Sequence, residues 1–405
     1  MKNNKTTYKS TAIGFIPNDW EVKKLGDFVN ISSGISPSLL KLSGRKKKYP
    51  FLKVEDLNNS DKYQVSSREY SDEEKSIIAE NSVIFPKRGA AILNNKVRIN
   101  SVCVQMDSNM MALTPISGKI STEYLFYTII RVQLFKIADT SSIPQINNKH
   151  ILPLLFSVPP LPEQQKIASI LSTWDNAIDN CKSIIEELKI RNKGLAQKLL
   201  TGKIRVEGFE EKWQVKAMNE CISFTPRPIT KPTDNYLALG LRSHGKGIFH
   251  KTDFDPSSIA METMFEVKEN DLIINITFAW EQAVAIVSKK DEGGLVSHRF
   301  PTYTFNDKNA IPDFFRHYIL QKRFKFLLES ISPGGAGRNR VMSKTDFLKL
   351  DIKLPEVNEQ KAIVTILDKA TEELNQYQQK LQALYLQKKG LMQQLLTGKT
   401  RVKII

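Results

Sequence analysis

The chain has 405 residues, of which 41% are hydrophobic and 25% charged, a composition typical of a globular protein with two or three domains. No apolar run approaches the roughly 18–20 residues that span a bilayer, and the polar opening MKNNKTTYKST lacks the apolar core of a signal peptide. Cys103, Cys181 and Cys221 have no metal-ligand spacing and are a poor basis for a disulfide framework. We therefore expect a cytoplasmic protein with a flexible tail over 1–13. Its net charge of +16 favours a polyanion as partner.

Residues 14–157, the first head, are expected to form a mixed α/β domain. Short β-rich runs between polar loops predict strands at Tyr49–Val54, Ser82–Phe85 and Ser101–Gln105. An amphipathic pattern predicts one helix over Thr122–Ile137.

The region 158–206 that follows has the pattern of a coiled-coil helix. Pro162 stands at its entry, where proline is tolerated, and Gly202 follows its last turn, where a left-handed cap is expected. Apolar residues recur at alternating four- and three-residue steps, with the polar Asn192 at one step. This predicted seam consists of Ile167, Leu171, Trp174, Ile178, Cys181, Ile185, Leu188, Leu195 and Leu199.

The same order then repeats. A second α/β head, 207–353, has predicted strands at Tyr236–Leu239, Asp271–Thr277 and Gln282–Val287, and a predicted helix over Pro312–Leu328. The region 354–405 has Pro355 at its entry, Gly398 as its cap and Lys388 at the polar step. Its seam consists of Ile363, Leu367, Ala370, Leu374, Tyr377, Leu381, Leu384, Leu391 and Leu395.

Residues 163–206 align without a gap on 359–402, with 17 identities over 44 positions clustered at the two ends. The segment KGLAQKLLTGKIRV (193–206) matches KGLMQQLLTGKTRV (389–402) at 11 of 14 positions. The unit starts GFIPNDWEV and GFEEKWQV also correspond, with Trp20 opposite Trp213. The chain is therefore an internal, pseudo-twofold duplication.

Two matching seams are buried most simply against each other, which predicts an antiparallel coiled coil with one head at each end. The alternative is that each helix packs only on its own head. Gly194 and Gly390 cost each helix about 1 kcal/mol relative to alanine. Their equal placement suggests close approach of the two helices or a contact site; the alternative is that both copies inherited the glycine without a role for it.

No catalytic constellation is evident. The chain has no phosphate-binding GxxxxGK[ST] loop, HExxH or paired CxxC, and its five histidines lack ligand spacing. Asp255, Glu266 and Lys268 mimic a nuclease pattern, but Glu-x-Lys recurs elsewhere in the chain and is treated as background. We expect no catalytic or metal-binding residue.

The heads are instead rich in basic and amide side chains on predicted loops. Phosphates need positive charge, guanine is read by Arg or Lys, and adenine by Asn or Gln. Each short group of basic and amide residues would also fit a loop that is merely exposed to solvent. DNA binding is favoured because such groups recur in both heads. In the first head the candidates are Arg45, Lys46, Lys47, Lys48, Lys87, Arg88, Asn94, Asn95, Lys96 and Arg98. In the second head they are Arg227, Arg242, His244, Lys246, Gln282, Arg299, Arg338, Asn339 and Arg340. Trp280 fits a core position or a base-stacking one.

Several motifs resemble those of the specificity subunits of type I restriction-modification systems. They are VPPLPEQQKIASIL (158–171), LPEVNEQKAIVTIL (354–367), the two LLTGK helix ends and the repeated unit starts. The likeness covers essentially the whole chain. It implies two target recognition domains, each reading one half of a split DNA site, alternating with two conserved helical regions.

The resemblance further implies that the helices set the spacer and dock two methyltransferase (modification) subunits, which restriction subunits then join. S-adenosylmethionine would be bound by the modification subunits, and ATP and Mg by restriction subunits, so that this chain would bind no cofactor. A coiled-coil adaptor that binds proteins without reading DNA sequence remains the alternative.

Overall fold

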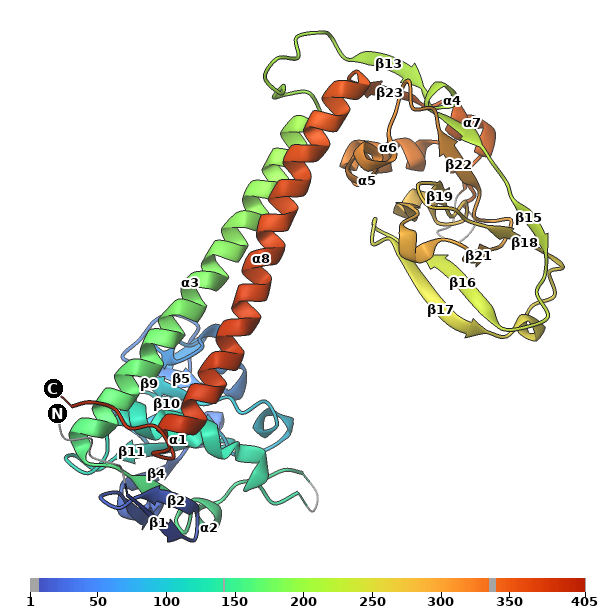
Figure 1. Ribbon diagram of the computed structural model, residues 1–405. Coiled ribbons are helices and arrows are strands. Elements are labelled where there is room, and N and C mark those ends of the chain that lie inside the picture. Colours follow the sequence, from blue (N-terminus) through green and yellow to red (C-terminus); the bar gives the residue numbers. More distant parts are fainter. Residues whose placement is uncertain (1–6, 141–142, 335–339, 405) are drawn as a thin grey trace, which may run out of the picture. The chain divides into compact units, whose positions relative to one another are not determined.

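The computed structural model describes residues 7–140, 143–334 and 340–404. The chain forms two compact units, each built from both halves of the sequence. Unit 1 consists of Met1–Lys182 and Gln379–Ile405, and unit 2 of Ser183–Gln378. Each unit therefore contains one head and parts of both long helices, α3 (Leu161–Leu199) and α8 (Val357–Leu395) (Figure 1). No helix in the described ranges is long and apolar enough to cross a membrane.

The first head contains a five-stranded sheet, a three-stranded sheet and two strand pairs. The larger sheet has the order β4-β11-β8-β9-β6, and β3 pairs with β12 directly before α3. The strands of the first head are β1 (Tyr8–Thr11), β2 (Gly14–Pro17), β3 (Glu21–Lys24), β4 (Val29–Ser33), β5 (Tyr49–Leu52), β6 (Tyr63–Gln64), β7 (Glu69–Ser71), β8 (Val83–Pro86), β9 (Arg98–Asn100), β10 (Gln105–Met106), β11 (Met110–Pro115) and β12 (Leu155–Val158). Its helices are α1 (Thr122–Val132) and α2 (Asn148–Ile151).

The second head repeats this plan with different side chains. Its four-stranded sheet, β14-β22-β19-β20, has the order and antiparallel pairing of β4-β11-β8-β9, and β13 pairs with β23 directly before α8. Its strands are β13 (Gln214–Ala217), β14 (Ile222–Phe224), β15 (Pro228–Thr230), β16 (Tyr236–Leu241), β17 (Ile248–Phe254), β18 (Thr263–Glu266), β19 (Leu272–Ile274), β20 (Val284–Ile286), β21 (Leu295–Val296), β22 (Thr302–Phe305) and β23 (Asp351–Leu354). Its helices are α4 (Met218–Cys221), α5 (Pro312–Tyr318), α6 (Lys322–Ser330) and α7 (Lys344–Leu348).

Four expectations about these elements were wrong. The helix predicted over Thr122–Ile137 ends at Val132, because Gln133 has a positive φ of +61°. Residues 8–11, assigned to a flexible tail, form β1, which pairs with β2, while residues 1–6 lie outside the described ranges. The predicted strand Ser101–Gln105 is a strand only at Gln105, because the chain bends after β9, where the Asn100 side chain binds the Val102 carbonyl. The helix predicted over Pro312–Leu328 is interrupted between α5 and α6.

The helices pair antiparallel within each unit. In unit 1, Lys388 of α8 forms an ion pair with Asp175 of α3, and Lys182 lies over the Tyr385 ring. In unit 2, Arg191 bonds to Glu373, and the Asn192 amide donates to the Ala370 carbonyl at 2.7 Å. The two polar steps of the heptad pattern, Lys388 and Asn192, are thus both used in helix–helix contacts.

The structure places every predicted seam residue in a buried or half-buried position. In unit 1 these are Ile167, Leu171, Trp174, Ile178, Cys181, Leu381, Leu384, Leu391 and Leu395. In unit 2 they are Ile185, Leu188, Leu195, Leu199, Ile363, Leu367, Ala370, Leu374 and Tyr377. The seam merges at its ends with the cores of the heads: Leu395 and Leu396 belong to the core of the first head, and Leu199 and Leu200 to that of the second.

Two glycine predictions had different outcomes. Gly202 and Gly398 have φ angles of +68° and +71°, so both form the left-handed caps expected after the helices. A Cβ on Gly194 or Gly390 would meet nothing within 4 Å. Close approach of α3 and α8 therefore does not explain Gly194 and Gly390.

Each helix start is locked to a helix end by the same set of side chains. In unit 1, the buried Glu163 carboxylate accepts hydrogen bonds from Trp20 at 2.9 Å and from Arg401 at 2.7 and 2.9 Å. In unit 2, Glu359 accepts them from Trp213 at 3.1 Å and from Arg205 at 2.7 and 2.8 Å. Charge-assisted, two-pronged Arg–carboxylate bonds of this kind fix geometry strongly.

The glutamine that follows each glutamate holds the head. Gln164 accepts a hydrogen bond from the Ser121 N–H, just before α1, and donates to the Pro159 carbonyl. Gln360 accepts one from the Ile311 N–H, just before α5, and donates to the Pro355 carbonyl. The repeated Glu-Gln motif thus joins head, helix start and helix end in each unit.

Candidate nucleic-acid interface

In the second head, the segments around the predicted residues Arg242, Arg299 and Arg340 converge on residues 275–282. The backbone N–H of Ile276 donates to the Arg299 carbonyl at 3.0 Å, and that of Met342 donates to the Ile276 carbonyl at 2.8 Å. The tip of the β16–β17 hairpin reaches the same segment, because the His244 N–H donates to the Glu281 carbonyl at 2.6 Å. Segments far apart in the sequence thus meet at residues 275–282, which we call the 275–282 hub.

The side chains around the hub combine positive charge with aromatic surface. The Arg340 guanidinium lies 5.4 Å from the centre of the Trp280 ring, and that of Arg242 lies 5.6 Å from the Phe249 ring. Lys246 and Arg299 are exposed and have no ion-pair partner among the described residues. Arg338 and Asn339 lie outside the described residues. Trp280 is half-buried, and its indole N–H donates to the Thr277 carbonyl. The Arg340 guanidinium lies over one face of the Trp280 ring.

His244 has a conformational role in the hairpin. His244 and Gly245 have φ angles of +62° and +65°. Two successive left-handed residues form the tight turn that suits the twist of a two-stranded hairpin. This turn exposes the imidazole and places Arg242 and Lys246 on either side of the tip.

The topologically equivalent segment of the first head begins with Lys87 and Arg88, directly after β8. The Lys87 ammonium donates to the Ser33 hydroxyl at 2.9 Å, and its pKa lies below the ordinary value because of burial and the neighbouring Arg88. Arg88 is exposed, with one long contact to Gln145 at 3.4 Å. Asn94 is exposed nearby in the chain, while Lys96 donates to the Asn58 side chain.

The basic loop at residues 45–48 of the first head contains two cations with an ion-pair partner and two without one in the described part of the chain. Arg45 and Lys46 are exposed, and neither has an ion-pair partner in the described part of the chain. Lys47 pairs with Asp72 at 3.2 Å and Lys48 with Glu74 at 2.6 Å. Exposed pairs of this kind are weak, so both lysines could still exchange a carboxylate for a phosphate.

Asn95 and Gln282, both predicted to bind DNA, make hydrogen bonds within the fold. Each follows a short 3-10 turn, η4 (Ala90–Ile92) or η7 (Ala279–Glu281), and each has a positive φ, +47° and +64°. The Asn95 amide donates to the Ile130 carbonyl and accepts from the Leu134 N–H, at the end of α1. The Gln282 amide donates to the Ile319 carbonyl at 2.7 Å, at the break between α5 and α6. Both side chains are thus held by hydrogen bonds within the fold.

Arg98 and Arg227 also belong to the interior of the heads. Arg98 donates to the carbonyls of Val97 and Leu57, and burial lowers its pKa. Arg227 forms a two-pronged pair with Asp271, which is 2% exposed. Breaking such a pair would leave a buried charge without a partner. Both guanidinium groups are thus engaged within the second and first heads, Arg227 with Asp271 and Arg98 with backbone carbonyls.

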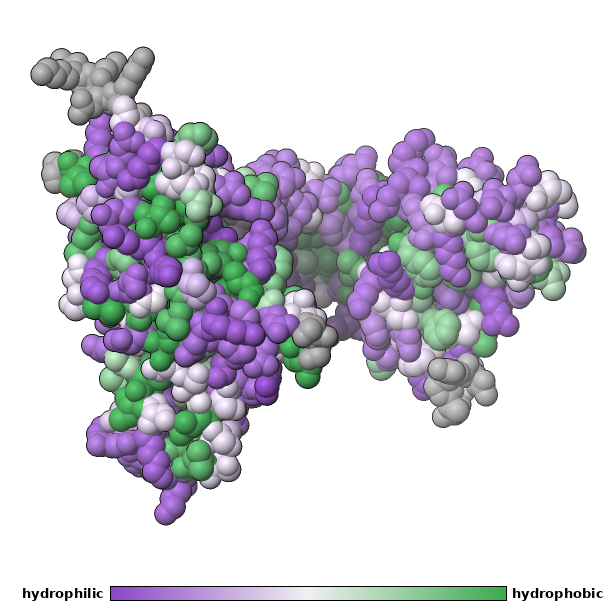
Figure 2. Space-filling view, turned by 90° about the horizontal axis from the view of Figure 1, so that it is seen from below, coloured by the Kyte–Doolittle hydropathy of each residue, from purple (hydrophilic) through white to green (hydrophobic). Residues whose placement is uncertain are grey.

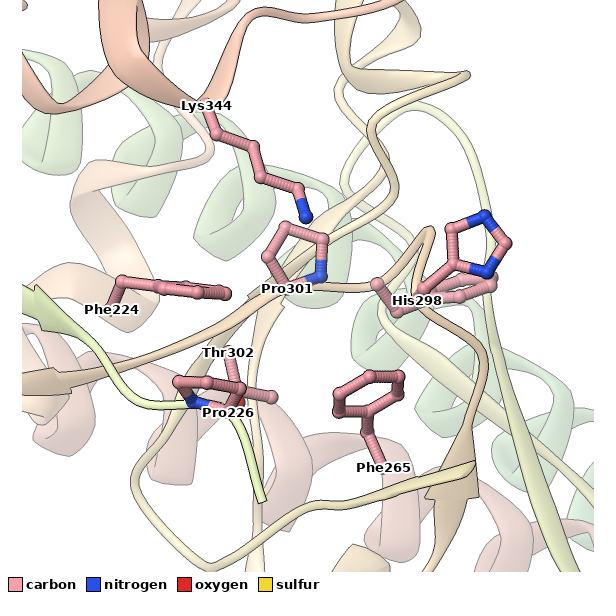
Figure 3. Close-up of a pocket in the computed structure, with 8 residues that line it drawn as sticks. Phe224, Pro226, Phe265, His298, Pro301, Thr302 and Lys344 are labelled. Atoms are coloured by element: carbon pink, nitrogen blue, oxygen red, sulfur yellow. The ribbon is translucent and has the colours of Figure 1, made fainter. Parts of the chain in front are cut away.

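An aromatic recess in the second head was missed by the sequence analysis. Its lining includes Phe224, Pro226, Phe265, His298 and Lys344, around a cavity of about 40 Å³ (Figure 3). The Lys344 ammonium lies 5.4 Å from the centre of the Phe224 ring. Apolar side chains contact the thymine methyl in the major groove, and this recess offers several of them beside a lysine. His298, beside the predicted Arg299, is the one sequence signal that pointed there.

A second, open groove of about 340 Å³ lies over β16, β17 and β21. Phe249, Phe254 and Phe278 line it, and the Lys251 ammonium lies 5.6 Å from the Phe254 ring. On the face shown in Figure 2, small hydrophobic patches lie among hydrophilic residues. Aromatic rings beside cations can stack on bases as well as contact phosphates.

The described residues include no group of three or more His, Cys, Asp or Glu side chains that could hold a metal ion. The Asp255 carboxylate, part of the nuclease-like pattern, is bonded to the backbone and hydroxyl of Ser257 and caps a turn.

The chain matches a family model described as "Type I restriction modification DNA specificity domain" twice, over residues 17–190 and 210–384. It is 24% identical to the MjaVIII specificity subunit of Methanocaldococcus jannaschii, covering 96% of this chain and 94% of that protein. It is 28% identical to the putative MjaX specificity subunit of the same organism, covering 98% and 97%.

Solved structures share the fold. The specificity subunit from M. genitalium is similar with a TM-score of 0.52 and 14% identity, covering 98% of both chains. The HsdS subunit from Thermoanaerobacter tengcongensis is similar with a TM-score of 0.55 and 14% identity, covering 95% of this chain and 98% of that one.

Proposed function

The chain belongs to the family of type I restriction-modification DNA specificity proteins, and we propose that it is the DNA-reading subunit of a methyltransferase–nuclease complex. The observation that carries this proposal is the 275–282 hub, where the segments that carry Arg242, Lys246, Arg299 and Arg340 meet, with the Arg340 guanidinium over the Trp280 ring. Exposed cations beside an aromatic ring are the groups that bind phosphates and stack on bases.

In this proposal each head reads one half of a split DNA site. The two heads share strand order, yet equivalent positions carry different side chains, such as Lys87-Arg88 in one and Asn275-Ile276 in the other. A shared scaffold with different exposed groups supports two readers of different sequence. Arg45 and Lys46 supply phosphate contacts in the first head, and Lys246 and Arg299 in the second.

The helices serve as the docking site for two modification subunits and set the spacer between the half-sites. The helix ends and their Glu–Arg locks are repeated almost without change, which supports two equivalent docking positions. The modification subunits would bind S-adenosylmethionine and methylate adenine, and restriction subunits with ATP and Mg would join the same assembly. The chain itself contributes binding and no catalytic group.

The test is to exchange the second head for that of another specificity subunit and to map methylated bases across the genome. We expect one half of the methylated motif to change and the other half to stay. A motif with both halves unchanged would refute the proposal.

A protein-binding adaptor makes a different prediction for salt. A DNA reader loses affinity steeply as salt rises, because each neutralised phosphate releases a counterion. Binding of the assembled complex to its methylation site, measured between 50 and 200 mM salt, should fall by about a hundredfold or more. A flat salt dependence would favour the adaptor.

A further inference from the structure

The open groove of about 340 Å³ in the second head is an aromatic sheet face, which we call the β16–β17 groove. Paired residues of neighbouring strands lie on the same side of a sheet. Three cross-strand pairs of β16 and β17 line the groove: Tyr236–Phe254, Ala238–Lys251 and Gly240–Phe249. The intervening Leu239 and Leu241 are buried in an apolar core of the second head. The core is thus complete without any further cover on the aromatic face.

Two local features of the hairpin give this face its shape. Asp253 has a φ of +53° at a β-bulge, where β17 uses three residues to span what β16 spans in two. Without the extra residue, Phe254 and Lys251 would lie on opposite faces of the sheet. Gly240 lies under the Phe249 ring, because a Cβ at this position would collide with that ring. Bulges that redirect a side chain in this way are frequent beside functional sites.

The groove also contains a polar group that the fold leaves unsatisfied. Asn275 lines the groove and is only 8% exposed. Its Oδ1 accepts a hydrogen bond from the Thr277 N–H at 3.0 Å, whereas its Nδ2 is accessible and has no hydrogen bond to any described residue. Buried amide groups are nearly always paired. A fixed amide with a free donor therefore indicates that a ligand supplies the acceptor.

Cations flank the aromatic rings of the groove. The Lys251 ammonium lies 6.0 Å from the centre of the Phe249 ring, and the Arg242 guanidinium lies 5.6 Å from it. Neither cation has an ion-pair partner in the part of the chain that the structure describes. Asn275 and Phe278, which is 38% exposed, belong both to the groove and to the 275–282 hub. Groove and hub are therefore parts of one surface.

These groups together have the chemistry of a site for an unstacked nucleobase. Aromatic rings stack on the faces of bases, and cations bind the adjoining phosphates. The volume of about 340 Å³ lies at the lower end of the range of about 300–1,000 Å³ for sites that take small ligands, which suits a single base. In a paired duplex the faces of each base are covered by its neighbours. A base can therefore enter the groove only after it has left the stack.

We propose that the β16–β17 groove binds one base extruded from the second half of the DNA site. Phe249 and Phe254 contact the base, the Asn275 Nδ2 donates to one of its acceptor atoms, and Lys251 and Arg242 lie toward its phosphates. Unpaired bases are available during methylation, because a methyltransferase extrudes the base that it modifies and leaves the opposite base without a partner. This inference rests on the proposed function, which supplies the DNA, and adds a site for a single unpaired base.

The experiment measures the affinity of the assembled complex for duplexes that carry one abasic residue, scanned through both strands of the second half-site. An abasic residue opposite the captured base removes its pairing partner, so that the base leaves the stack at lower cost and binding should strengthen at least tenfold. An abasic residue in place of the captured base removes the ligand itself and should weaken binding at least tenfold. One position should therefore give opposite effects in the two strands, whereas a merely more flexible duplex would give the same effect in both.

Phe249→Ala and Asn275→Asp test whether the groove causes this difference. Asn275→Asp keeps the acceptor for the Thr277 N–H and removes the free donor, so that the local fold should be retained. Both variants should bring the ratio of the two affinities close to one. Phe326→Ala is the matched control, because Phe326 is an exposed phenylalanine of α6 outside the lining of the groove. The control should keep the ratio of the unmodified chain.

The proposal would be overturned if no position gave opposite effects, or if the effects persisted in both groove variants, which would assign them to the methyltransferase. Loss of a protein subunit from the groove variants in native mass spectrometry, with an unchanged ratio, would assign the groove to a protein. Competition by free nucleoside monophosphates would assign it to a free nucleotide. If the complex bound its intact site no better than a scrambled duplex, the proposed function itself would fail.

Discussion

Arg401, near the end of the chain, donates hydrogen bonds of 2.7 and 2.9 Å to both carboxylate oxygens of Glu163, which lies 238 residues earlier. The carboxylate is 1% exposed, and its other contact is the indole N–H of Trp20. Arg205 and Glu359 repeat the arrangement in unit 2. One buried charge pair in each unit thus joins the start of one long helix to the end of the other.

Replacing Arg401 with alanine should destabilise unit 1 by about 3 kcal/mol, because it leaves the buried Glu163 charge without a cation. The stability of Arg401→Lys should fall between that of the unmodified chain and that of the alanine variant, because an ammonium cannot make two parallel hydrogen bonds to a carboxylate. Urea unfolding measures both effects, with the exposed Lys399→Ala as control. A loss of less than 0.5 kcal/mol for Arg401→Ala would show that the pair is not a major stabilising contact.

Asp19 makes the stability of unit 1 sensitive to acid. The hydrogen bond from Arg401 lowers the pKa of Asp19 below its ordinary value of 3.8, against the opposing effect of burial. The ionised carboxylate therefore stabilises the fold above about pH 4, and this stabilisation is lost as the pH falls through the lower, folded-state pKa. Asp19→Asn should reduce stability at pH 7, and its difference from the unmodified chain should shrink toward pH 2. Unfolding curves between these pH values test this, and a difference independent of pH would contradict it. Unit 2 has Lys212 at the equivalent position and supplies no such contribution.

Asn95→Ala and Gln282→Ala should lower stability without changing the DNA sequence that is read. Each substitution leaves buried backbone groups near a helix end without a hydrogen bond, at a cost of about 1–3 kcal/mol. Thermal unfolding gives the first quantity and methylation mapping the second. A changed target motif in either variant would show that the replaced residue takes part in reading the DNA sequence.

Lys246→Ala and Arg299→Ala should weaken binding to the second half-site only. Each phosphate contact removed should reduce the slope of log affinity against log salt by about one. Fluorescence anisotropy with DNA in which one or the other half-site is scrambled separates the two heads. Lys308→Ala, an exposed lysine of the same head outside the predicted DNA-binding residues, serves as control and should leave both slopes unchanged. Equal losses at both half-sites would remove these residues from the second reader.

The helices and the duplication could be predicted from sequence because their signals are local and repeated. The heptad steps give the seam from Ile167 to Leu199 directly, and the left-handed caps follow from Gly202 and Gly398. The sequence also predicted the α/β class of the heads. It did not predict the interruption after α5, which depends on the Gln282 amide reaching the Ile319 carbonyl across the fold.

The candidate site was predicted only in part, because charge on a loop does not reveal which way a side chain points. Arg227 and Arg299 are equivalent as sequence signals, yet one forms a buried pair with Asp271 and the other is exposed beside the 275–282 hub. The recess around Phe224 and Lys344 brings together residues from four separate segments, and no local pattern marks it.

By itself, the sequence determined that two heads alternate with two long helices, because hydrophobic periodicity and internal repetition are properties of neighbouring residues and of copies. The tertiary structure alone decided which polar residues hold the fold and which are free to bind. Burial and hydrogen bonding depend on partners as distant as Glu163 and Arg401, and these meet only when the chain is folded.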